Sequence, residues 1–166
     1  MPKIITFLIL LGVFFSCRDK VYDMAKVQEP GWEIITESLP QKVRVDPKAQ
    51  SILDTWKEYA VLERSFDKIY TSEFREDFVL IVEELVENQK KMEEGAYPAT
   101  FDISQIKGRQ KVFKTFILKT KGDLEYRQNP KESILEMIEA FNDLRNQFNV
   151  VVNNTLPEEL RVNETN

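Results

Sequence analysis

The sequence contains no histidine, and its 166 residues include a single cysteine, Cys17. Without histidine, a Ser-His-Asp or Cys-His catalytic group, a histidine-ligated zinc or di-iron site and a histidine-ligated haem are all excluded. One cysteine also excludes an intramolecular disulfide. Glycine is scarce, with five residues, and no glycine-rich phosphate-binding loop is present. We therefore expect no enzyme activity, no bound metal and no cofactor.

The charge pattern of the chain is mildly acidic. It holds 28 acidic and 23 basic residues, which give a formal net charge of −5. A net acidic chain is poorly suited to bind nucleic acid or anionic lipid headgroups, so we expect no nucleic acid partner. The neighbouring carboxylates Glu83-Glu84 and Glu93-Glu94 point in different directions on a helix. An enzyme that uses carboxylates is therefore the least favoured class of function.

An apolar run near the N-terminus, residues 4–15, ends at Ser16 and Cys17. Twelve residues are too few for a membrane-spanning helix, which needs about 20, and fit the core of a signal peptide, which needs roughly 7–15. Ordinary signal cleavage requires a small residue two positions before the last one, and Phe14 occupies that position. The run therefore predicts a signal peptide whose end is not of the ordinary secretory type.

The residues Phe14-Phe15-Ser16-Cys17 resemble the lipobox of bacterial lipoprotein precursors, in which a small residue stands directly before a cysteine. The resemblance implies that residues 1–16 are a signal peptide, that cleavage falls before Cys17, and that Cys17 carries the lipid. Two or more acyl chains give stable membrane attachment. The alternatives are a secreted protein with an unmodified cysteine and a protein that retains its N-terminal segment as an anchor.

The same resemblance implies a location in the cell envelope, with the membrane bound through the lipid on Cys17. Arg18 follows the cysteine, whereas some bacterial lipoproteins that stay in the inner membrane carry an acidic residue at that position. The outer membrane is therefore favoured over the inner membrane.

The rest of the chain divides into three parts. Residues 17–45 contain Pro30 and Pro40 and show no sustained periodicity, which indicates a lipidated N-terminus followed by a tether. Residues 46–156 are long enough for one domain with a core, and their apolar residues recur at helical spacing. Residues 157–166 form a polar tail.

Four helices are predicted within this domain, over residues 47–70, 73–94, 103–127 and 130–155. Their apolar positions recur every three or four residues. The last of the four carries the clearest stripe, formed by Ile134, Ile138, Phe141, Leu144, Phe148 and Val152.

Two proline-containing dipeptides predict helix starts. Asp46-Pro47 and Asn129-Pro130 each combine an N-cap residue with a proline in the first turn. Both proline residues have a fixed φ that suits this position.

The other boundaries rest on polar residues alone. A turn is expected at Thr71-Ser72, because acidic side chains follow it as in a helix start, although one continuous helix from 47 to 94 is the alternative. Asp102, with Gln105 three residues later, resembles a capping box.

These elements predict an all-α fold, an up-down-up-down four-helix bundle with short connections. Residues 73–94 hold eight acidic and three basic side chains, and residues 103–127 hold seven basic and two acidic ones. We expect these two helices to pack side by side and to pair their charges. The alternative is that residues 103–127 form a docking face for an anionic polymer or lipid.

Three polar residues fall on the apolar stripes of the predicted helices: Asn88, Gln110 and Arg145. At 1.5 Å per residue they lie at similar depth in the bundle, within about one helical turn. One hypothesis is a polar core layer that fixes the register of the helices, and a second is a site for a small anionic ligand. The third is that these side chains reach water at the edge of the core.

Two classes of function remain. The first is a membrane-anchored envelope lipoprotein whose non-catalytic helical domain is a structural or interaction module for another envelope protein. The second is a helical bundle that binds or senses a small ligand. An exposed apolar stripe on one helix would favour the first class, and a polar-lined cavity between helices would favour the second.

Overall fold

The computed structural model describes residues 39–154, and their regular secondary structure is entirely helical. The prediction of an all-α fold is therefore confirmed for this part of the chain. The predicted signal peptide, Cys17 and the polar tail lie outside the described residues. The elements are α3 (Pro47–Leu53), α4 (Lys57–Asp67), the 3₁₀ helix η2 (Lys68–Thr71), α5 (Arg75–Glu94), α6 (Ser104–Glu125) and α7 (Lys131–Asn153). None of the helices in residues 39–154 has the length and apolar character that crossing a membrane requires.

The predicted helix over residues 47–70 is wrong as a single element. The chain leaves the helical conformation at Trp56, with φ −93° and ψ 93°, and α4 starts immediately afterwards. The Thr55 hydroxyl donates a hydrogen bond to the Ile52 carbonyl at 2.7 Å, which closes the end of α3. The break places the Trp56 ring in the core, 4.9 Å from the Tyr97 ring. Periodicity did not reveal it, because the apolar spacing continues across the break.

The other boundaries agree with the structure more closely. Asp46 caps α3, since its carboxylate accepts a hydrogen bond from the Lys48 amide at 2.8 Å. The interruption expected at Thr71-Ser72 is confirmed, because η2 ends at Thr71 and Ser72 is extended. Asn129 accepts a hydrogen bond from the Lys131 amide at 3.0 Å. The helix α7 begins at Lys131, one residue later than an N-cap at Asn129 would place its start.

The capping box predicted at the start of α6 is wrong. Ile103 precedes the helix in an extended conformation, and no side chain caps the first turn. Asp102 instead forms an ion pair with Lys107.

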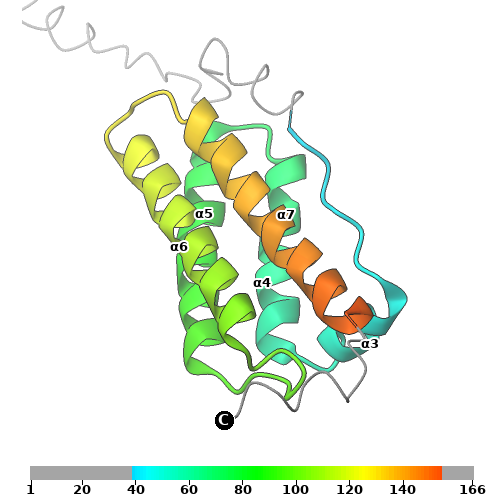
Figure 1. Ribbon diagram of the computed structural model, residues 1–166. Coiled ribbons are helices and arrows are strands. Elements are labelled where there is room, and N and C mark those ends of the chain that lie inside the picture. The colour runs from blue at the N-terminus through cyan, green and yellow to red at the C-terminus, as the bar shows by residue number, and fades with distance from the viewer. Residues whose placement is uncertain (1–38, 155–166) are drawn as a thin grey trace, which may run out of the picture.

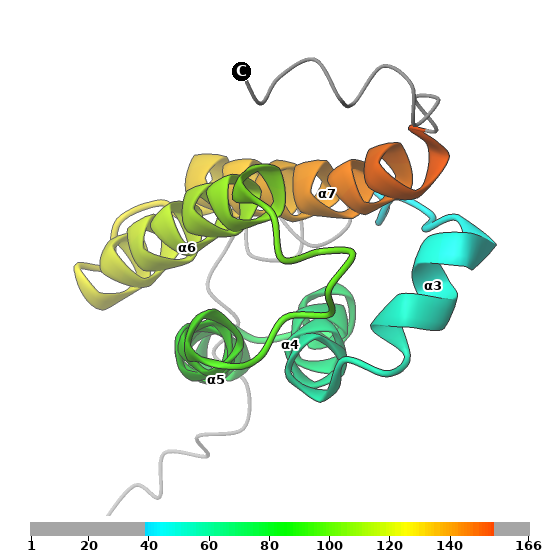
Figure 2. The same ribbon diagram turned by 60° about the horizontal axis from the view of Figure 1, so that its bottom comes forward.

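The helices α4, α5, α6 and α7 lie alongside one another, and α3 packs across one end (Figures 1 and 2). Figure 2 shows α4 and α5 in one layer and α6 and α7 in the other. Helices that are adjacent in sequence contact each other, and α3 contacts both α4 and α7. The connection from α5 to α6 lies at the same end as α3, and the connection from α6 to α7 lies at the opposite end (Figure 1).

Aromatic side chains from three helices form the centre of the core. The Phe66 ring of α4 stacks on the Phe141 ring of α7 with centroids 3.8 Å apart. The Phe113 ring of α6 lies 5.0 Å from Phe141. All three side chains are completely buried, as predicted for Phe141. Burial of such large apolar side chains is the main favourable contribution to folding.

The end of the predicted tether belongs to the packed structure. We call residues 39–46 the strap segment. Its Leu39 and Val45 side chains are buried in the core. The segment runs along α7 in an extended conformation from the η2 end to α3, since Tyr70 donates a hydrogen bond to the Pro40 carbonyl at 2.9 Å and Asn153 donates one to Asp46 at 3.2 Å.

Two asparagines of α7 bind the backbone of the strap segment as a neighbouring strand would. Asn142 accepts a hydrogen bond from the Val43 amide at 2.8 Å and donates one to the Gln41 carbonyl at 3.0 Å. Asn149 does the same with the Asp46 amide, at 2.6 Å, and the Arg44 carbonyl, at 3.0 Å. A carboxamide offers one acceptor and two donors, so each side chain satisfies two backbone groups at once.

Candidate functional site

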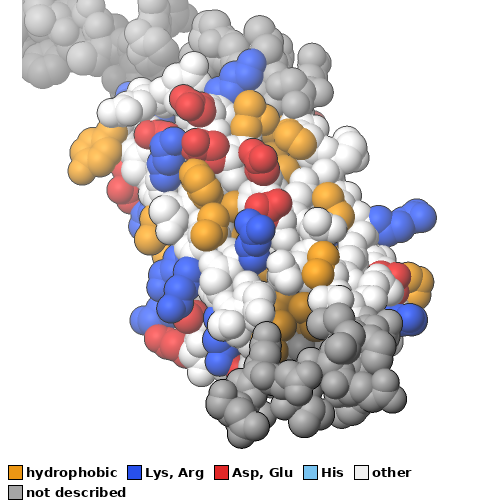
Figure 3. All heavy atoms as spheres, viewed as in Figure 1, with side chains coloured by type: hydrophobic (Ala, Val, Ile, Leu, Met, Phe, Trp, Pro, Cys, Tyr) orange, Lys and Arg blue, Asp and Glu red, His pale blue; other side chains and the backbone are white. Residues whose placement is uncertain are grey.

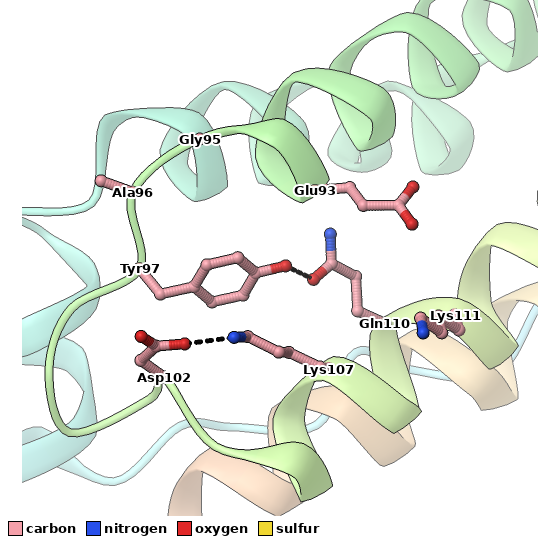
Figure 4. A pocket seen from close by; sticks show the side chains of 8 residues that line it. All are labelled: Glu93, Gly95, Ala96, Tyr97, Asp102, Lys107, Gln110 and Lys111. Atoms are coloured by element: carbon pink, nitrogen blue, oxygen red, sulfur yellow. Dashed lines mark hydrogen bonds and ion pairs between the residues drawn. The ribbon is translucent and has the colours of Figure 1, made fainter.

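A pocket of about 470 Å³ opens where α5 ends and α6 begins. Its volume lies in the range of small-molecule sites. The lining residues come from the last turn of α5, the loop 95–103 and the first two turns of α6 (Figure 4). They are Glu93, Gly95, Ala96, Tyr97, Asp102, Lys107, Gln110 and Lys111.

The loop that forms one wall of the pocket is held at two points. A Cβ atom at Gly95 would lie 3.0 Å from the Lys91 carbonyl oxygen and 3.2 Å from Cγ of Glu58, so glycine allows the loop to pass close to α4 and α5. Farther along, the amide of Phe101 donates a hydrogen bond to the Pro98 carbonyl at 2.8 Å, and the Phe101 ring is completely buried. The wall of the pocket is therefore formed before any ligand binds.

Tyr97 and Gln110 meet across the pocket (Figure 4). The Tyr97 hydroxyl donates a hydrogen bond to Oε1 of Gln110. Burial raises the pKa of Tyr97, so the hydroxyl keeps its proton and remains a donor at neutral pH. This bond fixes the orientation of the Gln110 carboxamide, because it identifies Oε1 as the acceptor and leaves Nε2 directed away from Tyr97.

Three buried side-chain atoms of the described residues have no hydrogen-bond partner: Gln110 Nε2, Gln89 Oε1 and Trp56 Nε1. All three belong to residues around Tyr97, since Trp56 packs on its ring and Gln89 donates a hydrogen bond to the Gln110 carbonyl at 3.4 Å. A buried polar atom without a partner costs about 1–3 kcal/mol. Such atoms are uncommon in native proteins and call for a physical explanation.

The charged side chains of the pocket are only partly neutralised within the described residues. Lys107 pairs with Asp102 and also lies 5.2 Å from the centroid of the Tyr97 ring. Glu93 pairs with Lys114 at 2.5 Å through Oε2. Lys111 has no ion-pair partner within residues 39–154. The Lys111 ammonium group and the second carboxylate oxygen of Glu93 are therefore available to a ligand, and the unpaired amide nitrogen of Gln110 lies buried at the pocket wall.

Of the three residues predicted as a polar layer, only Gln110 lines this pocket. All three are buried, as Arg145 and Asn88 are each 5% exposed and Gln110 is 1% exposed. Asn88 instead donates a hydrogen bond to Ser65 at 2.8 Å and lines a second pocket, of about 450 Å³, between α4 and α5.

Arg145 joins α7 to α4 and the strap segment. Its Nε donates a hydrogen bond to the Val43 carbonyl at 2.6 Å. Its Nη1 donates to the Tyr59 hydroxyl at 2.9 Å and to the Glu63 carboxylate. The hydrogen bonds of the described residues thus place Asn88, Gln110 and Arg145 in three separate groups.

Sequence reasoning missed Tyr97, Gln89 and Trp56 as residues of the site. Gln89 carried a signal, because it is a second polar residue beside Asn88 on the apolar stripe of α5. Tyr97 carried none, since a tyrosine in a loop has no periodic pattern by which to place it.

No family model, no curated protein and no solved structure matches this chain. Among residues 39–154 no cluster of three or more Cys, Asp or Glu side chains is placed to hold a metal ion.

Proposed function

We propose that this chain is a lipid-anchored protein of the cell envelope, acylated at Cys17 and held on the outer membrane. Its helical domain is a non-catalytic binding module with a site for a small ligand. The observation that carries the binding role is the polar-lined pocket, in which the buried amide nitrogen of Gln110 has no partner. The anchor rests on the resemblance of Phe14-Phe15-Ser16-Cys17 to a lipobox.

We infer that the domain is an up-down-up-down four-helix bundle to which α3 and the strap segment are added. Contacts between α4 and α5, α5 and α6, and α6 and α7 support this arrangement. The short connections between these helices support it as well. Aromatic contacts between α4 and α7 close the circle of four helices.

The strap segment enters the domain at the end opposite the pocket. Cys17 and Leu39 are 22 positions apart, so the connection spans at most about 80 Å whatever its conformation. The strap segment begins at the η2 end of the domain and the pocket lies at the α3 end. Since α7 has 23 residues, these ends are about 35 Å apart.

The surface supports ligand binding over docking through an apolar stripe. The exposed large apolar side chains are spread over all four long helices and a connection rather than along one helix: Val61, Leu80, Val112, Leu118, Tyr126 and Val150. Figure 3 shows acidic and basic side chains interspersed on one face, with hydrophobic side chains scattered between them. Single exposed apolar residues are ordinary on protein surfaces.

An interaction module for another envelope protein is the second candidate. It is favoured by Tyr126, which is 79% exposed beside Arg127 in the connection from α6 to α7. Exposed tyrosine and arginine side chains are enriched in protein interfaces.

The anchor is tested by replacing the cysteine. In cells that are given labelled fatty acid, the wild-type protein should carry the label and sediment with membranes. The variant Cys17→Ser should lose the label and appear as a soluble or unprocessed form. Ser16→Ala keeps a small residue before the cysteine and serves as the matched control, which should be labelled like the wild type. Persistent labelling of Cys17→Ser would refute the proposed anchor.

A further inference from the structure

We propose that the pocket between α5, the loop 95–103 and α6 binds a small zwitterion of the amino-acid type. The ligand carboxylate is recognised by Lys111 and Gln110, and its ammonium group by Glu93. This inference rests on the proposed ligand-binding function and gives it a chemical class.

The Gln110 carboxamide supplies a donor of fixed direction. Its Oε1 already accepts the hydrogen bond from Tyr97, so Nε2 is directed away from Tyr97 and towards the α5 side of the pocket (Figure 4). Nε2 is buried and has no partner, which means that an acceptor placed beside it removes the cost of an unpaired N–H group. A carboxylate oxygen is the strongest acceptor that a small organic molecule offers.

The neighbouring charges have opposite signs. Lys111 follows Gln110 on α6, has no ion-pair partner within residues 39–154 and supplies a positive charge for a carboxylate. Glu93 lies across the pocket on α5, and Figure 4 shows the Gln110 amide nitrogen directed towards that side of the pocket. Its ion pair with Lys114 uses Oε2 alone, so Oε1 is left to accept from an ammonium group.

A ligand that carries only one charge suits this pocket less well. A simple anion beside Gln110 would face the Glu93 carboxylate, and a simple cation would face Lys111 and the amide N–H of Gln110. Like charges at close range cost free energy, whereas a molecule with both charges satisfies all three groups. At about 470 Å³ the pocket has room for an amino-acid side chain beyond the two charged groups.

Three probes of matched size test this chemistry on the full-length protein in detergent. L-alanine carries both charges, propionate lacks the ammonium group and ethylamine lacks the carboxylate. We expect L-alanine to shift the Gln110 side-chain amide resonance and to raise the melting temperature. Propionate and ethylamine should do neither at the same concentration. Equal shifts with propionate and L-alanine would overturn the proposal of a zwitterion. The absence of a shift with both L-alanine and L-leucine would overturn it as well.

Matched variants locate the site. Lys111→Gln and Glu93→Gln each remove one charge from a partly exposed side chain, and each should weaken L-alanine binding about ten-fold. Lys90→Gln removes an exposed charge of α5 outside the pocket and should leave binding unchanged. If Lys90→Gln weakens binding as much as Lys111→Gln, the effect is one of overall charge and the site is refuted.

A further probe distinguishes failure of the zwitterion proposal from failure of the proposed ligand-binding function. Sorbitol is a neutral molecule that offers hydroxyl groups alone. A shift of the Gln110 amide by sorbitol, with none by L-alanine, would overturn the zwitterion and retain a small-ligand site. No shift by any of these probes would overturn both, whereas the lipid anchor is tested independently by the labelling of Cys17→Ser.

Discussion

At the scale of single residues, the surroundings of a position decide how a substitution there changes stability, and the glycines show this most directly. Gly108 and Gly122 lie within α6, and a Cβ atom built on either would meet nothing within 4 Å. Gly95 lies in the pocket loop, where a Cβ atom would be 3.0 Å from a backbone oxygen. The same substitution should therefore have opposite effects at these positions.

We predict that Gly108→Ala and Gly122→Ala each raise the free energy of unfolding by about 0.5–1 kcal/mol. Alanine restricts the unfolded chain and is the better helix former, and at both positions there is room for its methyl group. Gly95→Ala should lower the free energy of unfolding by about 1 kcal/mol, because the loop or the Glu58 side chain must move. Urea denaturation of the three variants measures these changes. A loss of stability in both α6 variants would contradict the open space around them.

Arg145 is a buried charged residue with several hydrogen-bond partners. Its guanidinium group is almost fully buried and donates hydrogen bonds to Val43, Tyr59 and Glu63. Burial raises the pKa of Tyr59 well above its usual range, so the hydroxyl is neutral and Glu63 supplies the negative charge. The three hydrogen bonds offset the cost of removing the guanidinium group from water.

We predict that Arg145→Met lowers the free energy of unfolding by about 3 kcal/mol. The substitution leaves the Val43 carbonyl and the Tyr59 hydroxyl without a donor, and it leaves Glu63 with Lys42 as its remaining partner. Arg109→Met is the matched control. Arg109 pairs with Asp143 on the surface, and its loss should cost at most about 1 kcal/mol. Equal losses in the two variants would mean that the buried contacts of Arg145 contribute no more than an exposed ion pair.

At the scale of elements, helical periodicity identified α5, α6 and α7 to within about two residues. It failed for residues 47–70, where the chain changes direction while the apolar spacing continues. The stretch before η2 is the example, since the apolar spacing runs through the break at Trp56 that separates α3 from α4. The strap segment was assigned to the tether for a related reason. Its contacts with Asn142 and Asn149 lie about 100 positions away in sequence, and no local pattern reports them.

Charge counting indicated the neighbour of α6 but not the individual ion pairs. Between α5 and α6 the pair Glu93–Lys114 forms at 2.5 Å. Two other cations of α6 pair with α7, as Arg109 contacts Asp143 at 2.7 Å and Lys119 contacts Glu136 at 2.5 Å. The reason is geometric, because α6 lies between α5 and α7 and its long side chains reach both.

The candidate site was predictable only in part. Gln110 was identified because a polar residue on an apolar stripe is visible in the sequence. Its hydrogen-bond partner Tyr97 was not, because the loop 95–103 has no periodicity.

The contact of α4 with α5 should make stability depend on pH through Glu84. Hydrogen bonds from Lys68, at 2.6 Å, and from Ser65, at 2.9 Å, hold the pKa of Glu84 below its ordinary value. A carboxyl group whose pKa is lower in the folded state than in the unfolded state stabilises the fold at pH values above its unfolded-state pKa. That contribution is lost as the pH falls through the folded pKa.

We predict that wild type is more stable than Glu84→Gln at neutral pH, and that this difference shrinks as the pH falls below about 4.5. Urea denaturation of both proteins at neutral and acidic pH measures this difference in the free energy of unfolding. Glu83→Gln changes an exposed neighbour on the same helix and serves as the control, for which we expect a smaller difference at neutral pH. A difference between wild type and Glu84→Gln that is constant with pH would contradict a role for the charge.

At the scale of the whole molecule, the boundary between tether and domain determines how an anchor would act on the helices. The sequence predicts that the domain begins at residue 46. In the structure, Leu39 and Val45 are already buried before that residue, and the strap segment bridges α7 and η2. Any force that reaches the domain through Leu39 is therefore passed first to the strap segment and its hydrogen bonds with α7.

Shortened chains distinguish the two boundaries. A chain that starts at Leu39 keeps every contact that the strap segment makes within residues 39–154, and it serves as the reference for a shorter chain. A chain that starts at Asp46 loses the buried side chains of Leu39 and Val45. It also leaves Arg145 without the Val43 carbonyl, and an unpaired buried donor alone costs about 1–3 kcal/mol. The chain starting at Asp46 should therefore be clearly less stable in urea denaturation.

Hydrogen exchange provides a second measurement of the same boundary. The Val43 and Asp46 amides donate to side chains of α7, so both should exchange slowly in the chain that starts at Leu39. Asn142→Ala should speed exchange at Val43, while Asn146→Ala, at an exposed position on the same helix, should not. If the chains that start at Leu39 and Asp46 are equally stable, the strap segment contributes nothing and the domain begins at residue 46, where the sequence alone places it.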